Sequence, residues 1–191
     1  MNIRLRSRFF PTLLLLCCAL IASGCLTAER KELVFSIKPD GSGTGTLTFY
    51  NIKSIEEDGK DNSSHDYAEL VKRYLKGTKF EESYPEYQNL RKRLYEENGK
   101  LNGQLTFDFK HYEDVGLYRH EGKGPWMYYI GNRSDVSVER FDTSNGSYPN
   151  DLLPIVFWPA EQTQLQIVNR FDDPGQAARS LLPLFKRFGT D

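Results

Sequence analysis

Two alternating runs on either side of a glycine-rich turn constrain the fold of this chain most strongly. In the run 32–38, Leu33, Phe35 and Ile37 point to one face of a strand, and Glu32, Ser36 and Lys38 point to the other. A second run, 44–52, is rich in Thr, Leu, Phe and Tyr and follows the sequence Pro-Asp-Gly-Ser-Gly. Two such runs joined by a Pro-Asp-Gly turn predict a β-hairpin.

Apolar residues at helical spacing predict an amphipathic helix further along the chain. Tyr67, Leu70, Val71, Tyr74 and Leu75 recur at i, i+3, i+4, i+7 and i+8. This spacing puts all five side chains on one helical face.

An Asn-Gly dipeptide predicts a second hairpin, because this pair favours the tight turns that join antiparallel strands. We expect its strands at 92–97 and 100–110. Pro85 is suited to the first turn of a helix, so a short helix is expected at 85–91.

The remaining elements complete an α+β fold. Further strands are expected at 126–130, 135–141, 155–158 and 164–169, and a final helix at 174–188, with a kink or interruption at Pro183. We therefore expect a mainly antiparallel sheet that opens with a β-hairpin and is packed by two or three helices, including a C-terminal one.

The N-terminus has the layout of a secretory signal, 1–24. Three arginines precede an apolar stretch at 13–21, and the small residues 22–24 lead to Cys25. The apolar stretch is too short to be a stable membrane anchor. No second apolar stretch of about 18 residues follows it in the sequence.

This ending resembles the lipobox of bacterial lipoproteins, although the family most often has Leu where this chain has Ala22. The resemblance implies that the Cys25 thiol receives a diacylglyceryl group and that cleavage leaves Cys25 as the first mature residue. Leu26, in place of Asp, implies export to the outer membrane in enteric-type bacteria. We expect residues 25–31 to form the lipidated N-terminus and a short tether, and 32–191 a single domain.

Composition argues against nucleic-acid binding and against cysteine-based chemistry. The chain has 25 basic and 26 acidic residues, and the signal holds three of the basic ones, which leaves 22 against 26 and a net charge of −4. Without a basic excess, we expect no nucleic-acid partner. Cys17 and Cys18 leave with the signal, so Cys25 is the sole mature cysteine and no disulfide or thiol nucleophile is expected.

Catalytic signatures are weak, and we expect no cofactor and assign no catalytic residue. The densest group of potential metal ligands is His111, Glu113 and His120, whose residue types suit zinc but whose spacing matches no common metal motif. The glycine-rich segment 41–45 follows a strand but opens no helix, so turn chemistry explains it.

Aromatic residues suggest a binding surface. Trp126 and Tyr128 share one face of an expected strand, and Trp158 ends another. Aromatic faces stack on sugars and pack against acyl chains. Cross-strand packing in the core is the alternative role for these residues.

The opening hairpin also resembles that of other bacterial lipoproteins, which place an Asp-Gly-Ser-Gly turn soon after the lipidated cysteine. Some of these carry lipid-binding α+β domains, and this chain lacks the C-terminal membrane helix seen in some.

Three hypotheses for the function stay open. The first is a lipid-anchored, non-enzymatic binding or envelope-maintenance module for a hydrophobic ligand, a lipid or a partner protein. The second is an envelope hydrolase with the His111 metal site, and the third is a structural subunit of an envelope complex.

Overall fold

The computed structural model describes residues 26–56, 58–130, 139–172 and 177–190. Its elements in chain order are β1 (Leu26–Thr27), β2 (Arg30–Ile37), β3 (Gly43–Tyr50), β4 (Lys53–Ile55), α1 (Ser63–Glu69), the π-helix η1 (Leu70–Leu75), α2 (Lys79–Ser83), β5 (Gln88–Glu97), β6 (Lys100–Phe109), the 3-10 helix η2 (Tyr112–Val115), β7 (Leu117–Tyr118), the 3-10 helix η3 (His120–Gly122), β8 (Trp126–Tyr129), β9 (Glu139–Ser144), β10 (Ile155–Trp158), β11 (Gln164–Phe171), β12 (Ala178–Ser180) and α3 (Leu182–Phe188).

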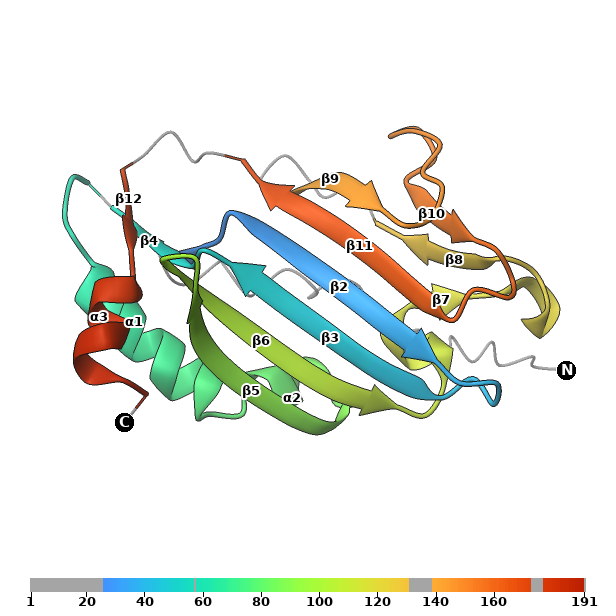
Figure 1. Cartoon of the computed structure of the whole chain (residues 1–191), viewed down its shortest axis with the longest axis horizontal. Helices are drawn as coiled ribbons and strands as arrows, with labels where there is room; N and C mark the ends of the chain where they lie inside the picture. Colours follow the sequence, from blue (N-terminus) through green and yellow to red (C-terminus); the bar gives the residue numbers. More distant parts are fainter. Residues whose placement is uncertain (1–25, 57, 131–138, 173–176, 191) are drawn as a thin grey trace, which may run out of the picture.

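A six-stranded antiparallel sheet forms the body of the molecule, in the order β5-β6-β3-β2-β11-β9 (Figure 1). Two smaller sheets, β1-β4-β12 and β10-β8-β7, lie at its two ends. Alternation sets the faces of the large sheet: Phe35 and Ile37 are buried, whereas Ser36 between them is half-buried.

Both predicted hairpins are confirmed. Strands β2 and β3 pair from Arg30↔Tyr50 to Ile37↔Gly43 around the Pro-Asp-Gly turn. In the second hairpin, Asn98 and Gly99 have φ angles of 52° and 70°, the left-handed pair that a tight hairpin turn needs.

Two glycines of β3 make room for two aromatic rings of β6. Gly43 is paired with Phe109 and Gly45 with Phe107, and a Cβ atom at either glycine would overlap the ring of its partner. The Phe107 ring also stacks on Tyr87, with centroids 3.8 Å apart. The rings therefore lie flat over the glycine backbone, a packing that compensates for missing glycine side chains.

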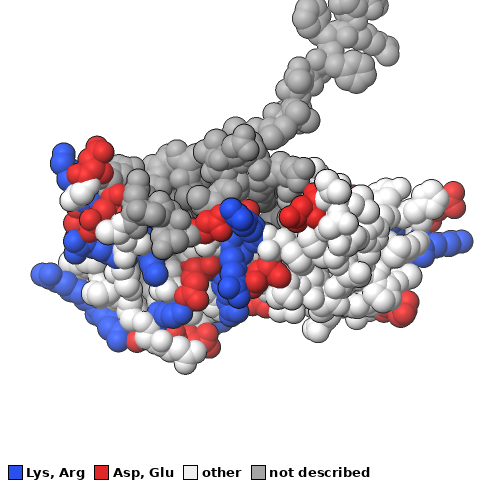
Figure 2. Space-filling view, turned by 90° about the horizontal axis from the view of Figure 1, so that it is seen from above, with Lys and Arg blue, Asp and Glu red and all other residues white. Residues whose placement is uncertain are grey.

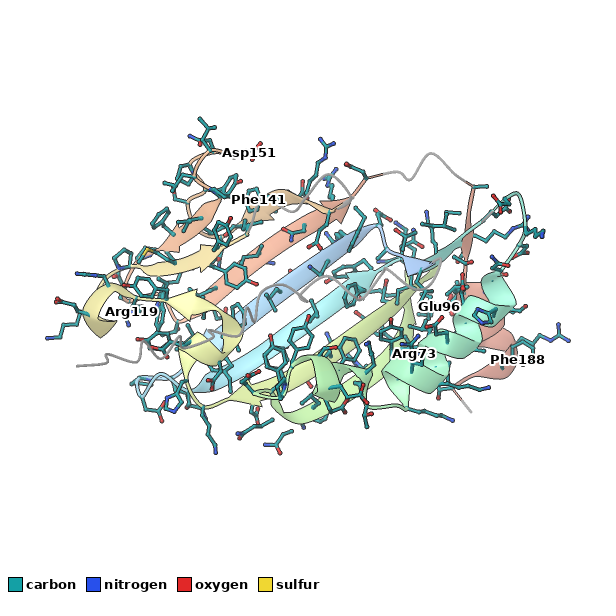
Figure 3. The ribbon with its side chains drawn as sticks, turned by 180° about the vertical axis from the view of Figure 1, so that it is seen from behind. Arg73, Glu96, Arg119, Phe141, Asp151 and Phe188 are labelled. Atoms are coloured by element: carbon teal, nitrogen blue, oxygen red, sulfur yellow. The ribbon has the colours of Figure 1, made fainter. Side chains whose placement is uncertain are left out.

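Helices α1, η1 and α2 lie toward one face of the large sheet, which Figure 3 shows from that side and Figure 1 from the other, and α3 packs beside α1 at the end of the sheet. Lys186 of α3 forms an ion pair with Glu96 of β5 at 2.7 Å. Toward the other end, β8 packs on the same face, where the Tyr128 ring lies 6.1 Å from that of Phe35. One face of the sheet is thus covered by helices toward one end and by the strand β8 toward the other.

The segment 26–31, expected to be a tether, is instead part of the fold. Leu26 and Thr27 pair with Ser54 and Lys53 of β4, and Leu26 to Ala28 are buried. Backbone hydrogen bonding and burial of Leu26 explain why this short stretch is ordered.

The helix expected at 85–91 is absent from that position, and this prediction was wrong. A short helix, α2, ends at Ser83 instead, and Tyr84 has φ −136° and ψ 70°. The residue before a proline is disfavoured in the helical region, so Pro85 ends a helix here and does not begin one. The strand β5 then starts at Gln88.

The C-terminal helix is present but shorter than expected. Residues 178–180 form β12, which pairs with β4, and α3 begins only at Leu182. Pro183 lies in the first turn of α3, where its missing N–H breaks no helical bond. It therefore starts the helix and introduces no kink.

The fold is more β-rich than the expected α+β class, with 47% strand and 21% helix. The strands expected at 126–130, 155–158 and 164–169 are confirmed. Of the strand expected at 135–141, residues 139–141 belong to β9 and 135–138 lie outside the described residues. No helix in the described part of the chain has the length and apolar character to cross a membrane.

Replacing Gly45 with Val should lower the free energy of unfolding by about 1–3 kcal/mol, because the new side chain must displace the Phe107 ring. Denaturant unfolding measures the change. The control is Thr46→Val, which lies on the opposite face of β3 and should change stability by less than about 0.5 kcal/mol. Equal effects of the two substitutions would contradict the proposed packing.

Candidate functional site

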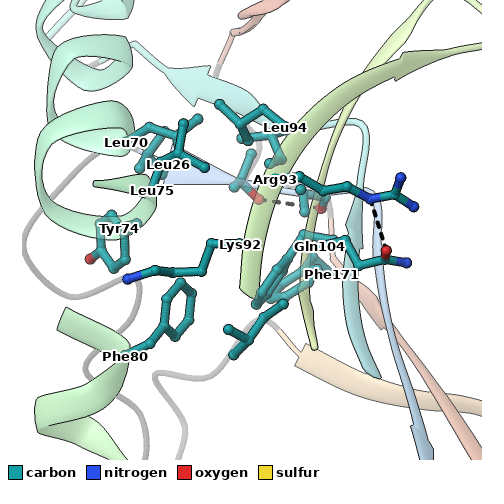
Figure 4. A pocket seen from close by; sticks show the side chains of 16 residues that line it. Leu26, Leu70, Tyr74, Leu75, Phe80, Lys92, Arg93, Leu94, Gln104 and Phe171 are labelled. Atoms are coloured by element: carbon teal, nitrogen blue, oxygen red, sulfur yellow. Dashed lines mark hydrogen bonds between the residues drawn. The ribbon is translucent and has the colours of Figure 1, made fainter. Parts of the chain in front are cut away.

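An apolar cavity of about 90 Å³ lies between the helical layer and the large sheet, close to β1 (Figure 4). It is partly open to solvent. Its walls come from the N-terminal segment, η1, α2, β3, β5, β6 and the end of β11, and consist of Leu26, Thr27, Ala28, Phe49, Ile52, Leu70, Tyr74, Leu75, Phe80, Lys92, Arg93, Leu94, Gly103, Gln104, Leu105 and Phe171.

The helical wall depends on the π-helical geometry of η1. Leu70, Tyr74 and Leu75 all line the cavity. The Lys76 N–H donates to the carbonyl of Val71 at 2.9 Å, an i to i+5 bond. This wider turn brings residues five apart closer to one face than an α-helix does, and such turns are frequent at functional sites.

The sheet wall is hollowed by a glycine. Gly103 of β6 lies between Ile52 and Leu94, and a Cβ atom there would come within 3.0 Å of the Ile52 Cδ1 atom and 3.3 Å of the Leu94 Cδ2 atom. All three residues line the cavity. A side chain at this position would therefore enter the cavity.

One charged side chain crosses the cavity from the sheet to the helical layer. Lys92 of β5 extends between Tyr74 and Phe80 (Figure 4). Its ammonium group donates to the Gly77 carbonyl at 2.6 Å and to the Glu81 carboxylate at 2.8 and 3.0 Å. The methylene stem lies along the apolar wall and the charge is bound at the helical layer, as expected for a long amphipathic side chain.

Two ionisable groups beside the cavity have shifted pKa values. Burial raises the pKa of Glu81, but the hydrogen bond from Lys92 and a backbone hydrogen bond outweigh burial, and the net pKa is lower than 4.5. Burial raises the pKa of the Tyr74 phenol, which is therefore neutral near pH 7.

The residues predicted as a metal site are not brought together. Among the described residues, the one group of three potential ligands within mutual reach is His65, Asp66 and Glu69, and the alternative site at His111, Glu113 and His120 does not form such a group. These three residues lie on exposed turns around η2 and η3.

The His65 group is explained by structural contacts. The buried Asp66 carboxylate accepts a hydrogen bond from the Ser54 hydroxyl at 2.5 Å, and Glu69 pairs with Arg73. Both carboxylates already have partners within the fold.

The three aromatic residues predicted to bind a ligand lie together but serve as packing groups. Trp126 and Trp158 are cross-strand partners of β8 and β10 and are only 4% and 1% exposed. Their indole N–H groups donate to Gln162 and Asn145. Tyr128 packs on Phe35, and none of the three lines the cavity. Cross-strand packing, the alternative considered for these residues, accounts for their positions.

Cys25, the predicted lipid attachment residue, lies outside the described residues, immediately before Leu26. The cavity itself was not predicted from the sequence. Its helical residues were recognised as an apolar stripe, but a stripe that borders a cavity has the same periodicity as one that is fully packed.

Comparison of the chain with protein-family models, curated proteins and solved structures finds no match.

Replacing Glu81 with Gln should lower the free energy of unfolding by about 0.5–1 kcal/mol at pH 7, because Lys92 loses its charged partner. The pKa of Glu81 is depressed in the fold, so its contribution is present above about pH 4.5 and is lost as pH falls through the folded pKa. Denaturant unfolding at pH 7 and at pH 3 measures this.

The matched control is Glu82→Gln, on the exposed side of α2. It should give no comparable pH-dependent difference from the native protein. A Glu81→Gln effect that persists unchanged at pH 3 would show that the ion pair is not its cause.

Proposed function

We propose that this chain is a lipid-anchored cell-envelope protein, held by acyl chains on Cys25, whose domain binds a hydrophobic ligand and catalyses no reaction. In a bacterium with two membranes, we place it at the outer membrane, on the basis of the residue after the cysteine. Binding is assigned to the cavity lined by Leu26, Leu70, Tyr74 and Leu94.

The position of Leu26 carries this proposal. Leu26 follows the candidate lipidation residue directly, pairs with Ser54 in β1, and forms part of the cavity wall. Because β1 belongs to the fold, no tether separates the domain from its anchor. A lipid on Cys25 would therefore hold the cavity at the bilayer surface, where acyl chains are abundant.

The chemistry of the cavity fits one end of an acyl chain. Its lining is dominated by Leu, Phe and Ile side chains, and the charge of Lys92 is neutralised by Glu81. At about 90 Å³ the cavity is smaller than the roughly 300 Å³ and more that enclose a whole drug-sized ligand. The rest of a longer chain would extend through the open side.

A second candidate, a structural subunit of an envelope complex, is favoured by a different surface. Figure 2 shows charged side chains gathered at the end that carries α1 and α3, whereas the surface between there and the opposite tip is largely uncharged. In and near β8 and β10, Leu152 is 96% and Tyr129 63% exposed, and Leu153 is also exposed. Exposed apolar groups mark protein contacts where they form a patch.

Replacing Cys25 with Ala should abolish labelling by a fatty-acid analogue and move the protein from the membrane to the soluble fraction. The thiol is the atom to which the diacylglyceryl group would attach, and two or more chains are needed for stable anchoring. Cys18→Ala, inside the signal, is the control and should leave labelling intact. Unchanged labelling of the Cys25 variant would refute the lipid assignment.

Native mass spectrometry of protein purified from its own membrane should show a retained hydrophobic ligand. Gly103→Leu should reduce its occupancy at least tenfold, because the new side chain enters the cavity. Thr106→Leu, on the opposite face of β6, should leave occupancy unchanged. Thermal unfolding confirms that both variants are folded.

Ligand retained equally by the two variants would place binding elsewhere. A retained protein in place of a small ligand, released by Leu152→Ser, would favour the subunit hypothesis.

A further inference from the structure

A partly buried polar cluster adjoins the apolar cavity on the same face of the large sheet. It consists of Lys31 of β2, Asn169 of β11 and Glu139 of β9. The ammonium group of Lys31 pairs with the Glu139 carboxylate, and the Asn169 Nδ2 atom donates to the same carboxylate at 2.5 Å. The charges of Lys31 and Glu139 therefore offset each other.

One atom of this cluster has no partner. Asn169 is 8% exposed, and its Oδ1 atom is the one buried side-chain polar atom of the described residues that lacks a hydrogen bond. A buried acceptor without a donor costs free energy, so such an atom calls for an explanation, such as a bound water or ligand. The sheet register between β11 and β9 shifts at Val168 and Asn169. Irregularities of this kind often re-aim side chains near binding sites.

The pairing of the strands places Asn169 close to the cavity. Asn169 is the cross-strand partner of Lys31, which in turn is the partner of the cavity residue Phe49. Phe171, two residues further along β11 on the same face, also lines the cavity and is the partner of Glu139. The cluster therefore adjoins the cavity wall at Phe49 and Phe171.

We propose that the ligand of the cavity is a neutral amphiphile whose apolar chain occupies the cavity and whose hydroxyl or amide N–H donates to the Asn169 Oδ1 atom. This inference rests on the proposed binding function and specifies its ligand class. The proposed ligand class is based on an apolar cavity that adjoins a hydrogen-bond acceptor without a donor.

The charges of the cluster disfavour an anionic head group. Lys31 is already paired with Glu139, so an incoming carboxylate or phosphate would compete with Glu139 for Lys31 and bring a second negative charge close to it. A neutral hydroxyl or amide group supplies the missing donor and breaks no bond.

The test compares two photoreactive probes in membranes that contain the full-length protein. Both have a ten-carbon chain with a diazirine near its apolar end. At the other end, one probe has a hydroxyl and the other a methyl ether, which cannot donate a hydrogen bond. At equal concentrations in the membrane, we expect the alcohol to label cavity residues with about tenfold higher affinity, since leaving a buried acceptor unpaired costs about that factor.

Asn169→Leu should remove this preference and keep labelling by the ether, whereas Gln166→Leu, on the opposite face of β11, should keep the preference. Equal affinities of the two probes for the native protein would overturn the inference and leave the proposed function standing. If neither probe labels the cavity, the proposed function itself fails.

Discussion

The large sheet has one apolar face, and the rest of the molecule is arranged by the need to cover it. Helices α1, η1, α2 and α3 have five to seven residues each, with η1 continuing α1, and gather toward one end of the sheet. The small sheet β10-β8-β7 covers the other end, where Tyr128 meets Phe35. Close-packed interiors leave few voids when like elements interdigitate. The cavity lies where the N-terminal segment, the helices and the sheet meet, so three differently shaped surfaces must fit one another there.

The same junction holds the polar groups that packing alone does not require. Lys92 joins β5 to the helical layer across the cavity, and the half-buried Lys31–Glu139 pair lies beside it. Ion pairs removed from solvent often contribute little net stability because desolvation offsets their attraction, and an unpaired Asn169 acceptor is unfavourable. The unpaired acceptor is the group for which the proposed ligand would supply a partner.

The sequence predicted most of the sheet because its signals were local. Alternation around the Pro-Asp-Gly turn and the Asn-Gly dipeptide fix two hairpins through neighbouring residues alone. The predictions that failed depended on tertiary contacts or on ambiguous prolines. Pro85 and Pro183 each allow a helix to begin or to end, and the sequence pattern alone did not decide between the two. The residues around Leu26 looked like a tether because their partner, β4, is a short strand without a clear periodic pattern.

The candidate site shows the limit of sequence reasoning more sharply. Trp126 and Trp158 drew attention because large aromatic residues suit both ligands and cores, and burial assigns them to the core. The residues that line the cavity are mostly ordinary apolar side chains and one glycine, Gly103, which comes together with the η1 residues only in the folded chain. From the sequence alone, Asn169 would be predicted to be a surface polar residue near the end of a strand. Its significance comes from burial and from a missing hydrogen bond, and both of these are properties of the folded molecule alone.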